Sequence, residues 1–176
     1  MALAKAASDI GLTTLNHSLV ARGAVELVEQ FLMNKRVNVS HVMQSFLKDR
    51  KEKSDTCGQG ESAQEVEILK KAIETHLHFL APHRHSWPSA LALLAAPHNV
   101  LSTLAYSREL ADDLCTYIGV QSTRRDWYTE RALVLSLYLS VELFFLTDQS
   151  EGLQDTKMFL GRALETFSSV RAATVR

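Results

Sequence analysis

The chain has 176 residues, of which 46% are hydrophobic and 22% are charged, and its formal net charge at pH 7 is −1. This length allows one compact domain with a substantial core, or at most two small domains. A net charge near zero excludes recruitment of nucleic acid or an anionic membrane by the field of the whole protein. Any such contact would need a local basic patch.

Residue usage predicts an all-α fold. The sequence has only seven Gly and three Pro and lacks alternating Val/Ile-rich segments bounded by turn residues, so we expect long helices and no strands. Its two cysteines, Cys57 and Cys115, lie in unlike contexts, which favours reduced thiols over a disulfide framework. The opening segment MALAKAASDIGL lacks the apolar stretch of a signal peptide and the arginines of a transit peptide, so we expect no leader in this chain.

The first elements in chain order are two short helices, predicted at 2–10 and 13–21 because of the Gly11 stop and the Thr caps that follow it. A long helix begins after Gly23, since apolar residues recur at helical spacing as far as Leu47. The next segment, KDRKEKSDTCGQGES at 48–62, is predicted to be a polar linker.

The second half of the chain predicts five further helices with no internal repeat. Ser62 to Glu65 have the form of a capping box, which predicts a helix start, and Pro82 ends that helix. Ser86-Trp87-Pro88 starts another helix, which breaks at Pro97. The last three helices are expected at 99–117 with a stop at Gly119, at 124–146 and at 153–170. Together these elements predict an irregular helical bundle.

The apolar run from Ala132 to Leu146 leaves two interpretations open. It has fifteen residues, fewer than the roughly 20 that span a bilayer. Glu142 lies inside it, and a charge at that depth in lipid would cost at least about 2.5 kcal/mol. We therefore expect no membrane span. A helix that is apolar all round is typical of a domain centre, but the wall of an apolar ligand cavity has the same composition.

Four segments carry a resemblance to a known family: HSWPSALALLAAPHNV, DDLCTYIGVQST, DWYTERALVLSLYLSVEL and LQDTKMFLGRALE. In this order and spacing they resemble the family of the coenzyme Q (ubiquinone) biosynthesis accessory protein number nine. The strong part of the resemblance covers 63–165, and 1–46 resembles the family more faintly. Arg124 and Arg125 depart from the family pattern, where an acidic residue and an aromatic are expected, and Cys115 replaces an expected aromatic.

The resemblance implies a fold similar to that of the TetR bacterial regulators, with an incomplete N-terminal helix-turn-helix. It divides the chain into a helix-turn-helix remnant plus connecting helix at 1–47, the linker at 48–62 and a lipid-binding helical domain at 63–172. It also implies a non-catalytic homodimer on the matrix side of the mitochondrial inner membrane. Contact with that membrane is expected to be weakened, because the family's C-terminal amphipathic helix is missing from this chain.

The resemblance further implies two sites. One binds isoprenoid or phospholipid, with Arg131 near the head group and a tail cavity walled by 90–101 and 132–146; its residues are Leu94, Leu101, Leu135, Tyr138 and Leu139. The other binds the di-iron hydroxylase that acts on demethoxyubiquinone, to which the protein presents that substrate. The expected contacts of this second site are Trp127, Tyr128, Leu114, Asp112 and Asp113.

Residue patterns argue against several other functions. His76 and His78 point nearly opposite ways on a helix, so we expect no metal site, and no phosphate-binding loop or nucleophile motif suggests a cofactor or an enzyme. The segment 2–21 lacks a basic recognition helix, so we expect no nucleic-acid binding. Two alternatives stay open: a TetR-like ligand-sensing transcription regulator and a purely structural bundle. For the dimer, we expect the C-terminal helices to pair through a broad apolar face formed by Leu153, Phe159, Leu160, Ala163, Leu164 and Phe167.

Overall fold

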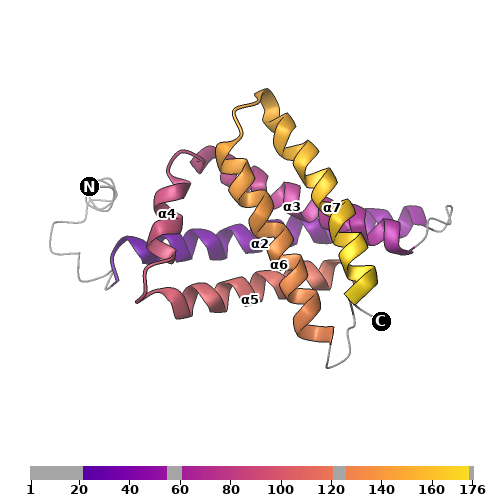
Figure 1. The fold of residues 1–176 in the computed structure, drawn as a ribbon, viewed down its shortest axis with the longest axis horizontal. Helices are drawn as coiled ribbons and strands as arrows, with labels where there is room; N and C mark the ends of the chain where they lie inside the picture. Colours follow the sequence, from indigo (N-terminus) through magenta and orange to yellow (C-terminus); the bar gives the residue numbers. More distant parts are fainter. Residues whose placement is uncertain (1–21, 55–60, 121–125, 175–176) are drawn as a thin grey trace.

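The computed structural model describes residues 22–54, 61–120 and 126–174. Within these ranges it has six α-helices and no strand, which confirms the all-α class. The helices are α2 Ala24–Ser54, α3 Glu61–Leu80, α4 Trp87–Leu94, α5 Val100–Tyr117, α6 Asp126–Thr147 and α7 Gln154–Thr174, with short 3-10 turns η2 Ala81–His83 and η3 Glu151–Leu153 (Figure 1). The helices predicted at 2–10 and 13–21 lie outside the described residues, and the resemblance to TetR regulators stays a prediction.

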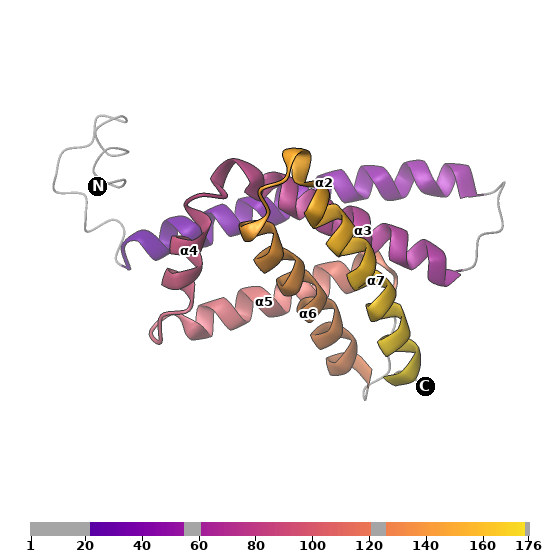
Figure 2. The ribbon, with the colours of Figure 1, turned by 45° about the horizontal axis from the view of Figure 1, so that its top comes forward.

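The helices pack in two directions. The long helix α2 and α5 extend along the length of the molecule, while α6 and α7 cross them as an antiparallel pair joined at 148–153 (Figure 1). Figure 2 shows α6 and α7 still side by side after the molecule is turned. Helix α6 packs against both α5 and α7, and α3 packs against α2, α5 and α7. Helix α6 therefore lies where these two directions meet.

The structure corrects the ends of the predicted linker. Helix α2 continues to Ser54, so the segment 48–54 is helical. The Lys, Arg and Glu residues of this segment favour helix, and Arg50 Nη1 bonds Glu67 Oε2 of α3 at 2.7 Å. Helix α3 begins at Glu61, so Ser62 lies inside it rather than capping it. Residues 55–60, which include Cys57, lie outside the described part of the chain.

Two loops carry clear stop and start signals. Gly119 has a positive φ of 70° and its amide bonds the carbonyl of Thr116 at 3.1 Å, so it ends α5 as predicted. Asp148 anchors the start of α7, since its Oδ2 accepts from the Thr156 amide at 2.8 Å and its Oδ1 from the Ser150 amide at 2.7 Å. Burial alone would raise the pKa of Asp148, but the hydrogen bonds from Ser150 and Thr156 lower it well below its usual range.

Helix α6 is a core helix on one side only. It buries Val134, Leu137, Tyr138, Val141 and Phe145. The opposite side leaves Leu139 42% and Leu143 58% exposed, so this apolar run is not buried all round. Helices α3, α5 and α7 pack against the buried side, and Lys35 of α2 and Trp87 of α4 also contact it. Within the described residues Leu139 and Leu143 stay uncovered. None of the described helices is both long and apolar enough to cross a bilayer.

Candidate functional site

The structure disperses the predicted lipid-tail residues. Leu94 and Tyr138 are buried in the core, and Leu135 is half-buried. Leu101 is 84% exposed on α5, and Leu139 faces outward on α6. None of the five lines either of the two pockets described below, so the expected cavity walled by 90–101 and 132–146 is not among them. The apolar character of these helices does not tell which of their side chains face a common cavity.

Arg131 is engaged within the chain. Its guanidinium forms an ion pair with Asp112 and donates from Nη1 to the carbonyl of Trp127 at 3.2 Å. The same group lies 3.8 Å from the centroid of the Trp127 ring, which is cation–π distance. A head-group phosphate would have to compete with these contacts, and the role of Arg131 in lipid binding stays a prediction.

The two aromatics of the predicted partner surface differ in exposure. Their rings meet edge to face with centroids 4.6 Å apart. Tyr128 is 74% exposed, whereas Trp127 is half-buried beneath the Arg131 guanidinium. The tyrosine is therefore the accessible member of the pair, and the tryptophan packs against its inner side.

The structure corrects the placement of Leu114 on that surface. Its side chain is completely buried, because α5 turns this face toward the core. The acidic pair beside it forms ion pairs with two different helices: Asp112 bonds Arg131 of α6, and Asp113 accepts from Arg36 Nε of α2 at 2.7 Å. These carboxylates hold α5 in place, and their contact with a partner stays a prediction. Arg124 and Arg125 lie outside the described residues.

The larger of the two pockets has a volume of about 610 Å³. It opens between α3 and the start of α7, and Val42 of α2 lines it as well. Its walls include Leu77, Phe79, Leu153 and Leu160, and the exposed Lys71 and Lys157 stand among the polar liners. Ligand cavities typically have volumes of about 300–1,000 Å³ and apolar walls with a few polar groups. This pocket fits an amphiphile.

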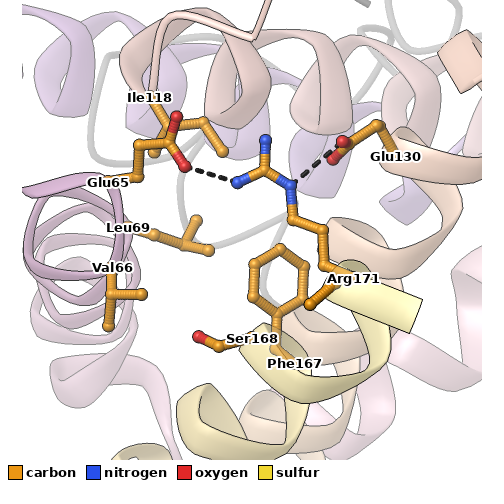
Figure 3. A pocket seen from close by; sticks show the side chains of 9 residues that line it. Glu65, Val66, Leu69, Ile118, Glu130, Phe167, Ser168 and Arg171 are labelled. Atoms are coloured by element: carbon orange, nitrogen blue, oxygen red, sulfur yellow. Dashed lines mark hydrogen bonds and ion pairs between the residues drawn. The ribbon is translucent and has the colours of Figure 1, made fainter. Parts of the chain in front are cut away.

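The smaller pocket, of about 270 Å³, lies where α6 begins and α7 ends (Figure 3). Arg171 spans it, donating from Nε to Glu130 Oε1 at 3.0 Å and from Nη1 to Glu65 Oε2 at 2.5 Å. Burial tends to lower the pKa of Arg171, but its hydrogen bonds to Glu130 and Glu65 raise it overall. Three helices thus meet through one guanidinium.

A buried polar cluster in the middle of the bundle was not anticipated from the sequence. Lys35 of α2 donates from Nζ to Tyr138 Oη at 3.1 Å, and Trp87 Nε1 donates to Glu142 Oε1 at 2.9 Å. Burial lowers the pKa of Lys35 to about 8 although the Glu142 carboxylate opposes this shift, and burial also raises the pKa of Glu142. His76 packs edge-on against Tyr138, at a centroid distance of 5.4 Å. Burial, and then the charge of Lys35, lower the pKa of His76 well below its ordinary value.

A signal for this cluster exists in the sequence. Leu32, Lys35 and Val39 have the spacing of one helix face, so the lysine occupies a position that the apolar pattern assigns to the core. Within the described residues, no group of three or more His, Cys, Asp or Glu side chains is placed to hold a metal ion.

Comparison with known proteins finds similarity to one family. The COQ9 family model matches residues 100–171. Human "Ubiquinone biosynthesis protein COQ9, mitochondrial" is 33% identical over 159 residues, which are 90% of this chain and 48% of the human protein. The protein of the same name from Drosophila melanogaster is 31% identical over 154 residues, 88% of this chain and 45% of its own length. The chain thus spans about half the length of the curated relatives it matches. Over the region these matches cover, the chain is similar to the COQ9 family.

Proposed function

We propose that this chain supports ubiquinone biosynthesis in mitochondria as an accessory protein that binds a lipid and does not perform the chemistry itself. The names of its relatives support the pathway and the compartment. The observation that carries lipid binding is the larger pocket, a cavity of about 610 Å³ with an apolar wall that includes Leu77, Phe79 and Leu160 and with polar side chains around it. An isoprenoid or acyl tail moves from one apolar medium to another when it leaves a bilayer for such a cavity, so the transfer is roughly neutral.

The tail is proposed to lie against Leu77, Phe79 and Leu160, in place of the α4 and α6 residues expected from the sequence. Lys71 and Lys157 would hold an anionic head group, since ammonium groups donate charge-assisted hydrogen bonds to phosphate oxygens. In this arrangement Arg131 would contact a head group only after leaving Asp112.

The proposed partner is the di-iron hydroxylase of demethoxyubiquinone, to which the chain would present that substrate on the matrix side of the inner membrane. Tyr128 is the favoured contact, because its ring is large and exposed and rests against the ring of Trp127. Tyrosine is among the residues that dominate the binding energy of interface centres. Trp127 would contribute by holding the tyrosine ring in place.

A homodimer is also part of the proposal, but on a different face from the one expected. Leu160, Leu164 and Phe167 of α7 are buried in the core of this chain and cannot also face a second copy. Leu139 and Leu143 of α6 are exposed and lie four residues apart on one helix face. They supply the apolar surface that a second copy would cover.

The experiment compares two substitutions on α2. Val42 lines the larger pocket and Val37 does not, yet both valines are exposed. Protein purified without detergent is extracted with organic solvent, and bound lipid is quantified by mass spectrometry. Val42→Trp should lose most of the lipid because the indole fills the cavity, while Val37→Trp retains the parental amount. Equal lipid in both variants, or none in the parent, would contradict the proposal.

A further inference from the structure

The smaller pocket contains a buried carboxylate oxygen with no partner. The Glu130 side chain is only 2% exposed, and its Oε1 accepts from Arg171 Nε. Its second oxygen, Oε2, is buried and accepts no hydrogen bond from any residue of the described ranges. Burial of a carboxylate oxygen without a hydrogen-bond donor costs free energy. A ligand group that donates a hydrogen bond to this oxygen would remove that cost.

The charges that line this pocket within the described part of the chain do not balance. Its charged side chains there are Glu65, Glu130 and Arg171, with a sum of −1. Arg171 uses Nε and Nη1 for the two carboxylates (Figure 3). Ser168, the other polar side chain of the lining, donates its hydroxyl to the carbonyl of Leu164. One positive charge with a hydrogen to donate would complete the site.

The rest of the lining is apolar and sets the size of the occupant. Val66, Leu69, Ile118 and Phe167 surround the space beside the ion pairs (Figure 3). A bare metal ion would leave this apolar space unfilled. At about 30 Å³ for each atom of water size, the volume of about 270 Å³ holds roughly nine non-hydrogen atoms.

We propose that this pocket binds a small organic cation, with an ammonium group on Glu130 Oε2 and a short apolar body against Leu69 and Phe167. The contact is a charge-assisted hydrogen bond in a site partly shielded from water, where such bonds are strongest. The larger pocket takes no part in this inference, which stands whether or not a lipid binds there.

The probe is 2-phenylethylammonium, whose ring and ammonium group match the two halves of the pocket. Titration is followed by heteronuclear NMR on the methyl groups of Val66, Leu69 and Ile118. The expected result is a saturable shift of these methyls by the ammonium probe and none by 3-phenylpropanoate, which has a similar shape and the opposite charge. N-acetyl-lysine amide tests for a polypeptide side chain, and tighter binding of this compound than of the amine would overturn the proposal.

Two variants and their matched controls localise the binding. Glu130→Gln keeps the shape but removes the charge, and should weaken the amine at least about tenfold, as loss of a charged hydrogen bond does. Glu67→Gln, the same change at an exposed α3 position outside the pocket, should leave affinity within about twofold.

Ala172→Trp gives a test that leaves the ion pairs intact. Ala172 is an exposed lining residue, so an indole there blocks the pocket and should abolish binding, whereas Ala173→Trp beside it should not. The comparison of Ala172→Trp with Ala173→Trp tests the binding site if Glu130→Gln fails to fold. Amine binding that survives Ala172→Trp, or survives Glu130→Gln in a folded protein, overturns the proposal, as does the absence of any saturable shift in the parent.

Discussion

The ammonium group of Lys35 donates a hydrogen bond to Tyr138 Oη over 3.1 Å in the middle of the bundle, where each side chain is only 2% exposed. This contact joins α2 to α6 across 103 positions of sequence. The Lys35 ammonium also lies 5.7 Å from the centroid of the Tyr138 ring and 5.8 Å from that of Trp87. Tyr138 is thereby held in the core, and it lines neither of the two pockets.

This buried lysine predicts a pH dependence of stability. The pKa of Lys35 is about 8 in the folded protein, against about 10.4 in an unfolded chain. Between these values the unfolded state binds more protons at Lys35, so the contribution of this residue to the free energy of unfolding should rise as pH increases from 8 to 10.4. The gain is at most on the order of 3 kcal/mol.

Lys35→Met should remove this rise, because methionine fills the same space without a titrating group. Urea unfolding at pH 8 and at pH 10 measures it, with Lys70→Met as the control, since Lys70 is exposed on α3. Burial also raises the pKa of the Cys115 thiol to about 11, which acts in the opposite direction over this range, so the difference in slope between parent and variant measures Lys35. A Lys35→Met variant that keeps the parental slope contradicts the prediction.

Truncation of Trp127 and truncation of Tyr128 should have different effects on stability and on binding. Tyr128→Ala removes an exposed ring, so stability should stay within about 1 kcal/mol of the parent. Capture of the hydroxylase should weaken by upward of about 2 kcal/mol if the tyrosine is an interface centre. Trp127→Ala should cost stability as well, roughly 1–3 kcal/mol, since it removes a half-buried ring and the surface on which Arg131 rests. Thermal melts and a binding assay with purified hydroxylase measure both effects. The prediction is wrong if Tyr128→Ala binds normally.

Substitution of Asp148, which caps the start of α7, should lower the free energy of unfolding. Asp148→Ala removes the acceptors of Ser150 and Thr156, and caps of this kind contribute about 0.5–2 kcal/mol. Because the pKa of Asp148 is lowered in the folded state, its contribution is complete above about pH 3.9 and is lost as pH falls further. The variant should therefore be less stable at pH 7 and show a smaller loss of stability on acidification below pH 4. Asp155→Ala, at an exposed position of the same helix, is the control. Equal unfolding free energies for both variants at pH 7 would exclude a capping role.

Lys71 and Lys157, which line the larger pocket, should favour anionic lipids over uncharged ones. Exchange of Lys71 and Lys157 for alanine should reduce retention of an anionic phospholipid severalfold, since two charge-assisted hydrogen bonds are removed. Retention of an uncharged isoprenoid should not change, because its binding depends on apolar contact. Lys70→Ala, beside Lys71 and outside the lining, is the control in lipid-retention assays. Parallel loss of both lipid classes would show that the lysines shape the pocket rather than select the head group.

Several features of the fold follow from local sequence. The Gly119 stop and the positions of α4, α5, α6 and α7 were predictable, because turn glycines, prolines and apolar periodicity act over a few residues. The segment 48–54 was misjudged, since its high charge was taken to indicate a loop, yet Lys, Arg and Glu are good helix formers.

The sites were harder to predict because they depend on which helices meet. Periodicity marks a helix face as apolar but does not name the face it packs against. Leu101 and Leu139, which the family resemblance assigns to a cavity wall, are exposed. The larger pocket combines residues of α2, α3 and α7, which are more than 70 positions apart in the case of Leu77 and Leu160. Arg171 likewise bonds Glu65 across 106 positions, and no local pattern pairs them.

The most direct test of lipid binding is photo-crosslinking with a phospholipid that carries a diazirine in its acyl chain. Protein loaded with this lipid is irradiated and digested, and the labelled residues are identified by tandem mass spectrometry. Labels at residues that line the larger pocket, such as Val42, Leu77 and Leu160, are the predicted result. Labels confined to Leu94, Leu101, Leu135 and Leu139, or a label that excess unlabelled phospholipid does not displace, would contradict it.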